Sequence, residues 1–225
     1  MVRAAQLLLA LFLPLSGLAQ AAGASPDSVT ISIRPGSDNA EIHQLMASVL
    51  HVEKWHIEAH NPQLAGRQFH LTYQEVRNGV PGPEQELTGS ATRRPRFDKQ
   101  GNFTLDAFAR QATETTLVNQ FYFAAGGVEK TFSSQPGPHP PYSLSPNIWP
   151  YKTLKPLGPV LPGQQPTAVH TFSVGKKVPF LVYTLPYESD GYFLYCGVIQ
   201  SKVPVNEWFA KFRIPHFVIY NLVVE

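Results

Sequence analysis

Histidine and glutamate side chains gather in one short part of the sequence, and these residue types can bind a metal ion. Five of the eight histidines lie between His43 and His70. Imidazole and carboxylate groups bind zinc, and imidazole also suits copper. No motif in the chain requires a cofactor, but these residues suggest a possible zinc or copper site made by His56, Glu58, His60 and His70.

The spacing of these residues restricts which of them can share one ion. In a strand, residues four apart are separated by roughly 13 Å along the axis, and residues two apart by roughly 6.6 Å. We therefore expect Glu58 with one flanking histidine, joined by His70 from across a hairpin. In a helix, His56 and His60 would converge instead, and Glu58 would point away. The alternative without a metal is a polar strand face exposed to solvent.

Residues 135–166 form a proline-rich stretch that also carries aromatic side chains. It contains ten prolines together with Tyr142, Trp149 and Tyr151, and so much proline excludes a regular element. A flexible linker between two domains is one interpretation. Because linkers rarely carry large aromatic residues, we favour an ordered, extended segment on the domain surface. Its three aromatic residues are then the predicted contacts with a partner.

The other reactive residues form no catalytic motif. Cys196 is the single cysteine, so an internal disulfide is excluded, and its aromatic neighbours favour a small buried hydrophobic residue. There is no nucleophile elbow of the G-x-S-x-G type, no phosphate-binding glycine loop and no paired CxxC motif. A hydrolase whose site is assembled from distant residues is a further hypothesis, and we favour a protein that is not an enzyme.

The N-terminal segment is typical of a cleavable secretory signal. Arg3 precedes an apolar run from Leu7 to Leu15, and small residues stand at Ala19 and Ala21. This run is too short to cross a hydrocarbon core of roughly 30 Å. The pattern predicts cleavage after Ala21 and export of the remainder.

Charge and hydropathy argue against nucleic acid and against a membrane span. The sequence has 18 lysines and arginines against 16 acidic residues, so its net charge recruits no polyanion. No later apolar run approaches the roughly 18 residues of a membrane helix. We therefore expect residues 22–225 to form one soluble domain, in a bacterial periplasm or, alternatively, secreted outside the cell.

Short strands must supply most of the framework that positions these residues. Alternation of apolar and polar residues, or a run of apolar and aromatic residues between turn signals, predicts ten strands. They span residues 28–34, 52–60, 68–76, 103–108, 117–124, 128–132, 169–174, 178–185, 192–199 and 217–224. We expect strands 169–174, 178–185 and 192–199 to be antiparallel neighbours. The strand over 217–224 is apolar on both faces and is predicted to be central in its sheet.

Two short helices complete the prediction. Asp38 and Glu41 have the spacing of a capping box, and apolar residues then recur at helical spacing up to Leu50. A second amphipathic helix is predicted to begin at Pro204, with Trp208 on its apolar face. Together the elements predict a mainly β fold, an antiparallel β-sandwich or open barrel with about two short helices.

The pattern as a whole favours a non-catalytic, exported β-domain that binds a protein or small-ligand partner. A periplasmic metal-binding protein that uses its His and Glu strand face is the first alternative. The hydrolase without a visible motif is the second.

Overall fold

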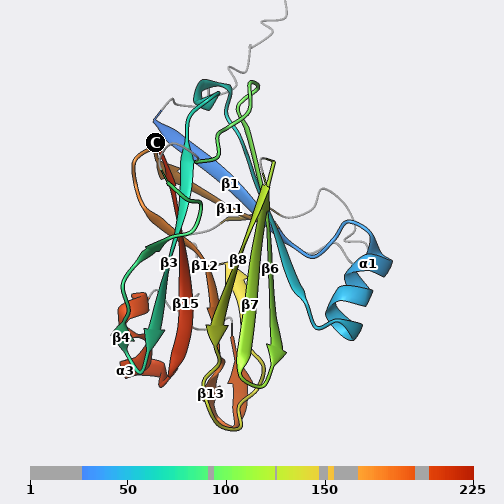
Figure 1. The fold of residues 1–225 in the computed structure, drawn as a ribbon, viewed down its shortest axis with the longest axis vertical. Coiled ribbons are helices and arrows are strands. Elements are labelled where there is room, and N and C mark those ends of the chain that lie inside the picture. Colours follow the sequence, from blue (N-terminus) through green and yellow to red (C-terminus); the bar gives the residue numbers. More distant parts are fainter. Residues whose placement is uncertain (1–26, 91–93, 125, 147–151, 155–166, 196–202) are drawn as a thin grey trace, which may run out of the picture.

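The protein is built from two antiparallel β-sheets that enclose an apolar core, with short helices attached (Figure 1). The computed structural model describes residues 27–90, 94–124, 126–146, 152–154, 167–195 and 203–225. The mainly β, antiparallel fold with two short helices confirms the sequence prediction. Among the described residues, no helix is both long and apolar enough to cross a bilayer.

The larger sheet has seven strands in the order β10-β11-β1-β2-β6-β7-β8, and every pairing is antiparallel. Its strands alternate buried and exposed side chains, which is the period of a sheet with one face on the core. The strands are β1 (Ser28–Pro35), β2 (Glu53–His60), β6 (Asn102–Thr113), β7 (Thr116–Phe123), β8 (Gly126–Ser133), β10 (Lys152–Leu154) and β11 (Thr167–Ser173).

The smaller sheet has the order β4-β3-β15-β12-β9, and a further short strand, β5, also pairs with β3. The predicted central position of the strand over residues 217–224 is confirmed, because β15 lies between β3 and β12 and is buried almost throughout. The strands are β3 (Phe69–Arg77), β4 (Val80–Pro81), β5 (Gln85–Glu86), β9 (Ser143–Pro146), β12 (Val178–Thr184) and β15 (His216–Val224).

The predicted neighbourhood of strands 169–174, 178–185 and 192–199 is wrong. β11 lies in the larger sheet and β12 in the smaller one, so the turn at Gly175 carries the chain from one sheet to the other. The third segment contributes β14 (Tyr192–Leu194), whose one strand partner among the described residues is β13 (Tyr187–Ser189), in a separate hairpin. Residues 196–199 of this segment lie outside the described residues. Sequence alternation identifies a strand but carries no information about which sheet receives it.

The proline-rich stretch contributes two strands, contrary to the expectation that it holds no regular element. β9 and β10 each lie at the outer edge of a sheet. Pro146 of β9 is compatible with an edge strand, because proline has no backbone N–H to donate and an edge strand has a neighbour on one side only. Residues 147–151 and 155–166 lie outside the described residues.

The helices are short and differ in how they pack. α1 (Ala40–Gln44) begins at Asn39, whose side chain accepts bonds from the backbone N–H groups of Glu41 and Ile42, so the cap is one residue later than predicted. η1 (Leu45–Val49) continues it as a π-helical turn. The second predicted helix is η4 (Val205–Glu207) followed by α3 (Trp208–Phe212), with Trp208 fully buried. A further single turn, η2 (Pro62–Leu64), precedes β3.

The two sheets meet across an apolar core that includes a buried polar pair, Asn119 and Tyr220. The Asn119 side chain of β7 donates a hydrogen bond to the Tyr220 hydroxyl of β15, and the Phe121 and Tyr220 rings lie 4.7 Å apart. The Asn119 Oδ1 atom is buried and has no hydrogen-bond partner among the described residues. A buried polar group without a partner destabilises a fold.

Removal of one polar group of this pair is expected to lower the free energy of unfolding more than removal of both. Tyr220→Phe leaves the Asn119 amide unpaired and should lower the free energy of unfolding by about 1–3 kcal/mol. The double variant Tyr220→Phe with Asn119→Leu removes both polar groups and should be more stable than Tyr220→Phe alone. Urea unfolding of the three proteins tests this, and a double variant less stable than the single one would contradict it.

Candidate functional site

The predicted metal ligands of β2 form polar pairs with the neighbouring strands: the two histidines with β6, and Glu58 with Ser32 of β1. His56, Glu58 and His60 lie on the outward face of β2. His56 Nδ1 lies 2.7 Å from Asp106 Oδ1, and its Nε2 lies 3.5 Å from Glu58 Oε2. His60 Nδ1 lies 2.7 Å from Asn102 Oδ1. Each histidine is thus occupied by a cross-strand partner.

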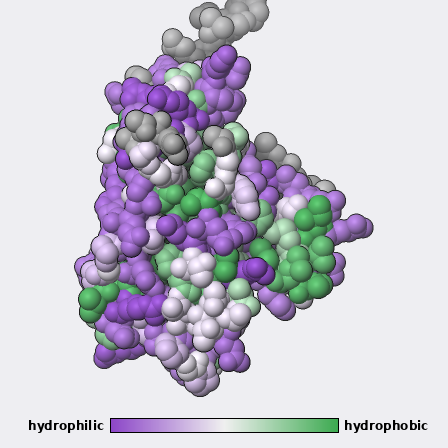
Figure 2. All heavy atoms as spheres, in the orientation of Figure 1, coloured by the Kyte–Doolittle hydropathy of each residue, from purple (hydrophilic) through white to green (hydrophobic). Residues whose placement is uncertain are grey.

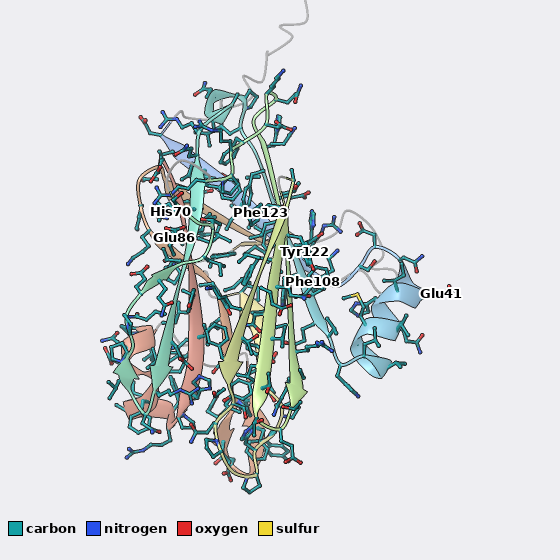
Figure 3. The ribbon with its side chains drawn as sticks, in the orientation of Figure 1. Glu41, His70, Glu86, Phe108, Tyr122 and Phe123 are labelled. Carbon is teal, nitrogen blue, oxygen red and sulfur yellow. The ribbon has the colours of Figure 1, made fainter. Side chains whose placement is uncertain are left out.

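His70 lies on the other sheet, and the predicted hairpin between its strand and β2 is wrong. β2 pairs with β1 and β6, whereas His70 belongs to β3. Its Nδ1 lies 3.0 Å from Oε2 of Glu86, which lies beside it in Figure 3. Its Nε2 lies 3.7 Å from Oε1 of Glu225, and Arg94 forms ion pairs with both carboxylates. The four predicted ligands therefore do not converge. In the part of the chain that the structure describes, no three His, Cys, Asp or Glu residues are grouped to hold a metal.

Of the three predicted partner contacts, Tyr142 is a core residue. It is 5% exposed, because its ring packs between Tyr183 and His216. The prediction of an exposed contact is thus corrected for this residue. Trp149 and Tyr151 lie outside the described residues, as does Cys196.

Tyr142 begins a buried hydrogen-bonded chain that runs to the surface. Its hydroxyl lies 2.5 Å from Nδ1 of His216, a fully buried residue, and His216 Nε2 lies 2.9 Å from Glu75 Oε1. Arg77 donates to the same carboxylate oxygen from 2.7 Å. The backbone N–H of Gln135 donates to the Tyr142 oxygen. His216 of β15 thus links Glu75 of β3 to Tyr142.

The proton positions in this hydrogen-bonded series are fixed by the Glu75 carboxylate, which can only accept. The Glu75 carboxylate only accepts, so His216 Nε2 carries a proton, and Nδ1 of the neutral ring accepts the Tyr142 hydroxyl proton. Burial lowers the pKa of His216 to about 4, assisted by the charge of Arg77 and opposed by Glu75. Burial likewise raises the pKa of Tyr142 to about 12. A hydroxyl, a histidine and a carboxylate in this order are also found at nucleophilic sites. Here the hydroxyl and the imidazole are both buried and neutral, and we interpret the chain as structural.

A helical insertion between β1 and β2 is the feature that departs most from a plain sandwich. β1 and β2 are antiparallel neighbours paired up to Pro35 and Trp55, and two residues would suffice to join such strands. Residues 36–52 instead form α1 and η1, which project from the sheet (Figure 1). Gly36 has a φ of +77°, and a Cβ there would lie 2.2 Å from the His43 ring, so glycine lets the insertion fold back closely. A connection longer than its strands require is often functional.

The insertion exposes an apolar stripe. Neither α1 nor η1 contains a buried residue, and the exposed fractions of Ile42, Leu45, Val49 and Leu50 lie between 48% and 64%. Figure 2 shows apolar residues gathered on this projection. A helix this short is marginal in water unless its apolar face is packed. The stripe is therefore an exposed apolar surface on a short helix that is not packed against the rest of the domain.

Two clefts lie beneath the insertion and meet at Ala47, Val52 and Glu53. One has a volume of about 170 Å³ and runs toward Trp55 and β9. The other has a volume of about 240 Å³ and opens beside Arg110 of β6. The insertion thus contributes one wall of both clefts, and the sheets contribute the other; the two adjoining clefts together are called the groove below.

Glu53 lines both clefts and joins β2 to β9. Its carboxylate accepts a hydrogen bond from the Ser143 hydroxyl at 2.8 Å and another from the Leu144 backbone N–H. Burial raises the pKa of Glu53, although both hydrogen bonds act in the opposite direction. Trp55 Nε1 donates to the Leu144 carbonyl oxygen at 2.7 Å. β2 of the larger sheet is thereby fastened to β9 of the smaller one.

Comparison of this chain with protein-family models, with curated proteins and with solved structures finds no match. The geometry of the insertion and its groove is therefore the basis for a functional proposal.

Sequence reasoning identified the helix but not the residues around it. Glu53, Arg110 and Ser143 are far apart in the chain and belong to no motif. One signal of this site in the sequence was the long connection between β1 and β2, two strands that both alternate apolar and polar residues. A second was the apolar stripe itself, which has the same spacing whether it faces a core or a partner.

The buried chain at His216 predicts a loss of stability in acid. The His216 side chain binds a proton near pH 6.5 in the unfolded state and only near pH 4 in the folded state. As the pH is lowered from 6.5 to 4, the free energy of unfolding should therefore fall by about 1.4 kcal/mol per pH unit. His216→Gln should lack this contribution, whereas the surface control His56→Gln should keep it. Urea unfolding from pH 4 to 8 tests the difference. Parallel curves for the wild type and His216→Gln would contradict it.

Proposed function

We propose that this chain is an exported, non-catalytic binding domain that contacts a protein partner through the helical insertion. The observation that carries the proposal is the apolar stripe of Ile42, Leu45, Val49 and Leu50 on a projection whose helices α1 and η1 contain no buried residue. An amphipathic helix that enters an apolar groove on a partner is a recurring mode of protein recognition.

The charges of the insertion favour a protein partner over a membrane surface. Asp38 and Glu41 are exposed on or beside α1, and Asp38 forms an ion pair with Arg34. Helices that bind membrane surfaces typically carry lysine and arginine opposite their apolar face. Between residues 38 and 51 there is neither.

Site-specific photo-crosslinking tests the contact. A photoreactive residue at Leu45 or Val49 should give one discrete adduct in the native compartment, and the same residue at Ser48 should not. The double variant Leu45→Gln with Val49→Gln should then weaken binding of the identified partner about 10- to 30-fold, the effect of losing a contact hot spot. Its free energy of unfolding should change by less than about 0.5 kcal/mol, because both side chains are already half exposed.

The matched control is the double variant Gln44→Ala with Ser48→Ala, which changes polar positions on the same helix. Its partner affinity should equal that of the wild type. Equal adducts from positions 45 and 48, or an unchanged affinity of the Leu45 and Val49 double variant, would contradict the proposal.

Export is supported by the N-terminal sequence alone and is tested separately. The purified protein should begin at Ala22 and should be recovered outside the cytoplasm. A large residue in place of Ala21 should block processing, because the cleavage site requires small residues. An N-terminus that retains residues 1–21 in the wild-type protein would contradict the prediction.

A further inference from the structure

The groove beneath the insertion is a separate site from the apolar stripe and has its own chemistry. Its two clefts, of about 170 and 240 Å³, meet at Ala47, Val52 and Glu53. Each is smaller than an ordinary ligand site, and together they reach the lower part of the usual range of about 300–1,000 Å³. The groove is thus large enough for one slender ligand.

One half of the groove is mainly apolar. Met46 and Ala47 line it from the helix, Trp55 from β2 and Leu144 from β9. Glu53 does not present a free carboxylate to this half, because both of its oxygens bind residues of β9. Lys54 also lines this half, but its charge is compensated by an ion pair with Asp106 at 3.2 Å. An uncharged chain is the occupant that this half accepts without loss of a hydrogen bond.

The other half has an unpaired positive charge at its mouth. Arg110 is exposed on the outward face of β6 and forms no ion pair or side-chain hydrogen bond within the described residues. His51 and Gln111 line the same cleft. A guanidinium presents a planar fork of donors that matches a carboxylate or a phosphate.

We propose that the groove binds an amphiphile with an anionic head group, which pairs with Arg110, and an unbranched apolar tail, which lies beneath Met46 and Ala47. The lining supplies both halves of this complementarity in two adjoining clefts that share Ala47, Val52 and Glu53. The proposal goes beyond the protein contact of the apolar stripe, and either can fail without the other.

Calorimetric titration of the processed protein with dodecanoate, below the concentration at which it forms micelles, tests the proposal. We expect one molecule bound per chain. Arg110→Ala should weaken binding about tenfold or more, while the exposed arginine control Arg67→Ala should leave it unchanged. Dodecyltrimethylammonium, with the same tail and a cationic head, should bind the wild type more weakly, and Arg110→Glu should reverse that order.

A second variant tests the tail half of the groove. Ala47→Trp fills the point where the two clefts meet and should abolish dodecanoate binding, with circular dichroism and the midpoint of thermal unfolding showing that the fold is kept. Should this variant unfold, Ala47→Leu provides the same test with less added volume. Absence of dodecanoate binding to the wild type, equal affinity for the two amphiphiles, or an unchanged affinity of Arg110→Ala would overturn the proposal.

Discussion

The fastening of β2 to β9 is the interaction on which the rest of the site depends. Glu53 and Trp55 reach from the larger sheet and bind the backbone and hydroxyl groups of Ser143 and Leu144 in the smaller one. A buried carboxylate would be costly without such donors. Because the insertion rejoins the sheet just before Glu53, the same contact fixes the base of the helix and both walls of the groove.

Local patterns in the sequence predicted most elements of the fold, because strand alternation and helix spacing depend only on neighbouring residues. β15 was even placed correctly within its sheet, since a strand that is apolar on both faces needs neighbours on both sides. The assignment of β11 and β12 to different sheets could not be predicted. That choice depends on packing between segments far apart in the chain, such as β1 with β11 and β12 with β15.

The same limit applies to the site. The residues with the most evident chemistry, His56, Glu58 and His60, became cross-strand pairs on an outer sheet face. Residues with no motif of their own, such as Glu53 and Arg110, acquired their importance from the groove that they share. A histidine that matters most to the core, His216, was not singled out, because its partners Glu75 and Tyr142 lie far from it in the sequence.

The position of β15 has a consequence for the order in which this protein can be made. The strand lies between β3 and β12 and pairs with both. The smaller sheet therefore lacks its central strand until residues 216–224 have been synthesised. Strand pairs this distant in sequence also form slowly, because a long loop must close first. The smaller sheet of a chain arranged in this way can therefore be completed only at the end of translation.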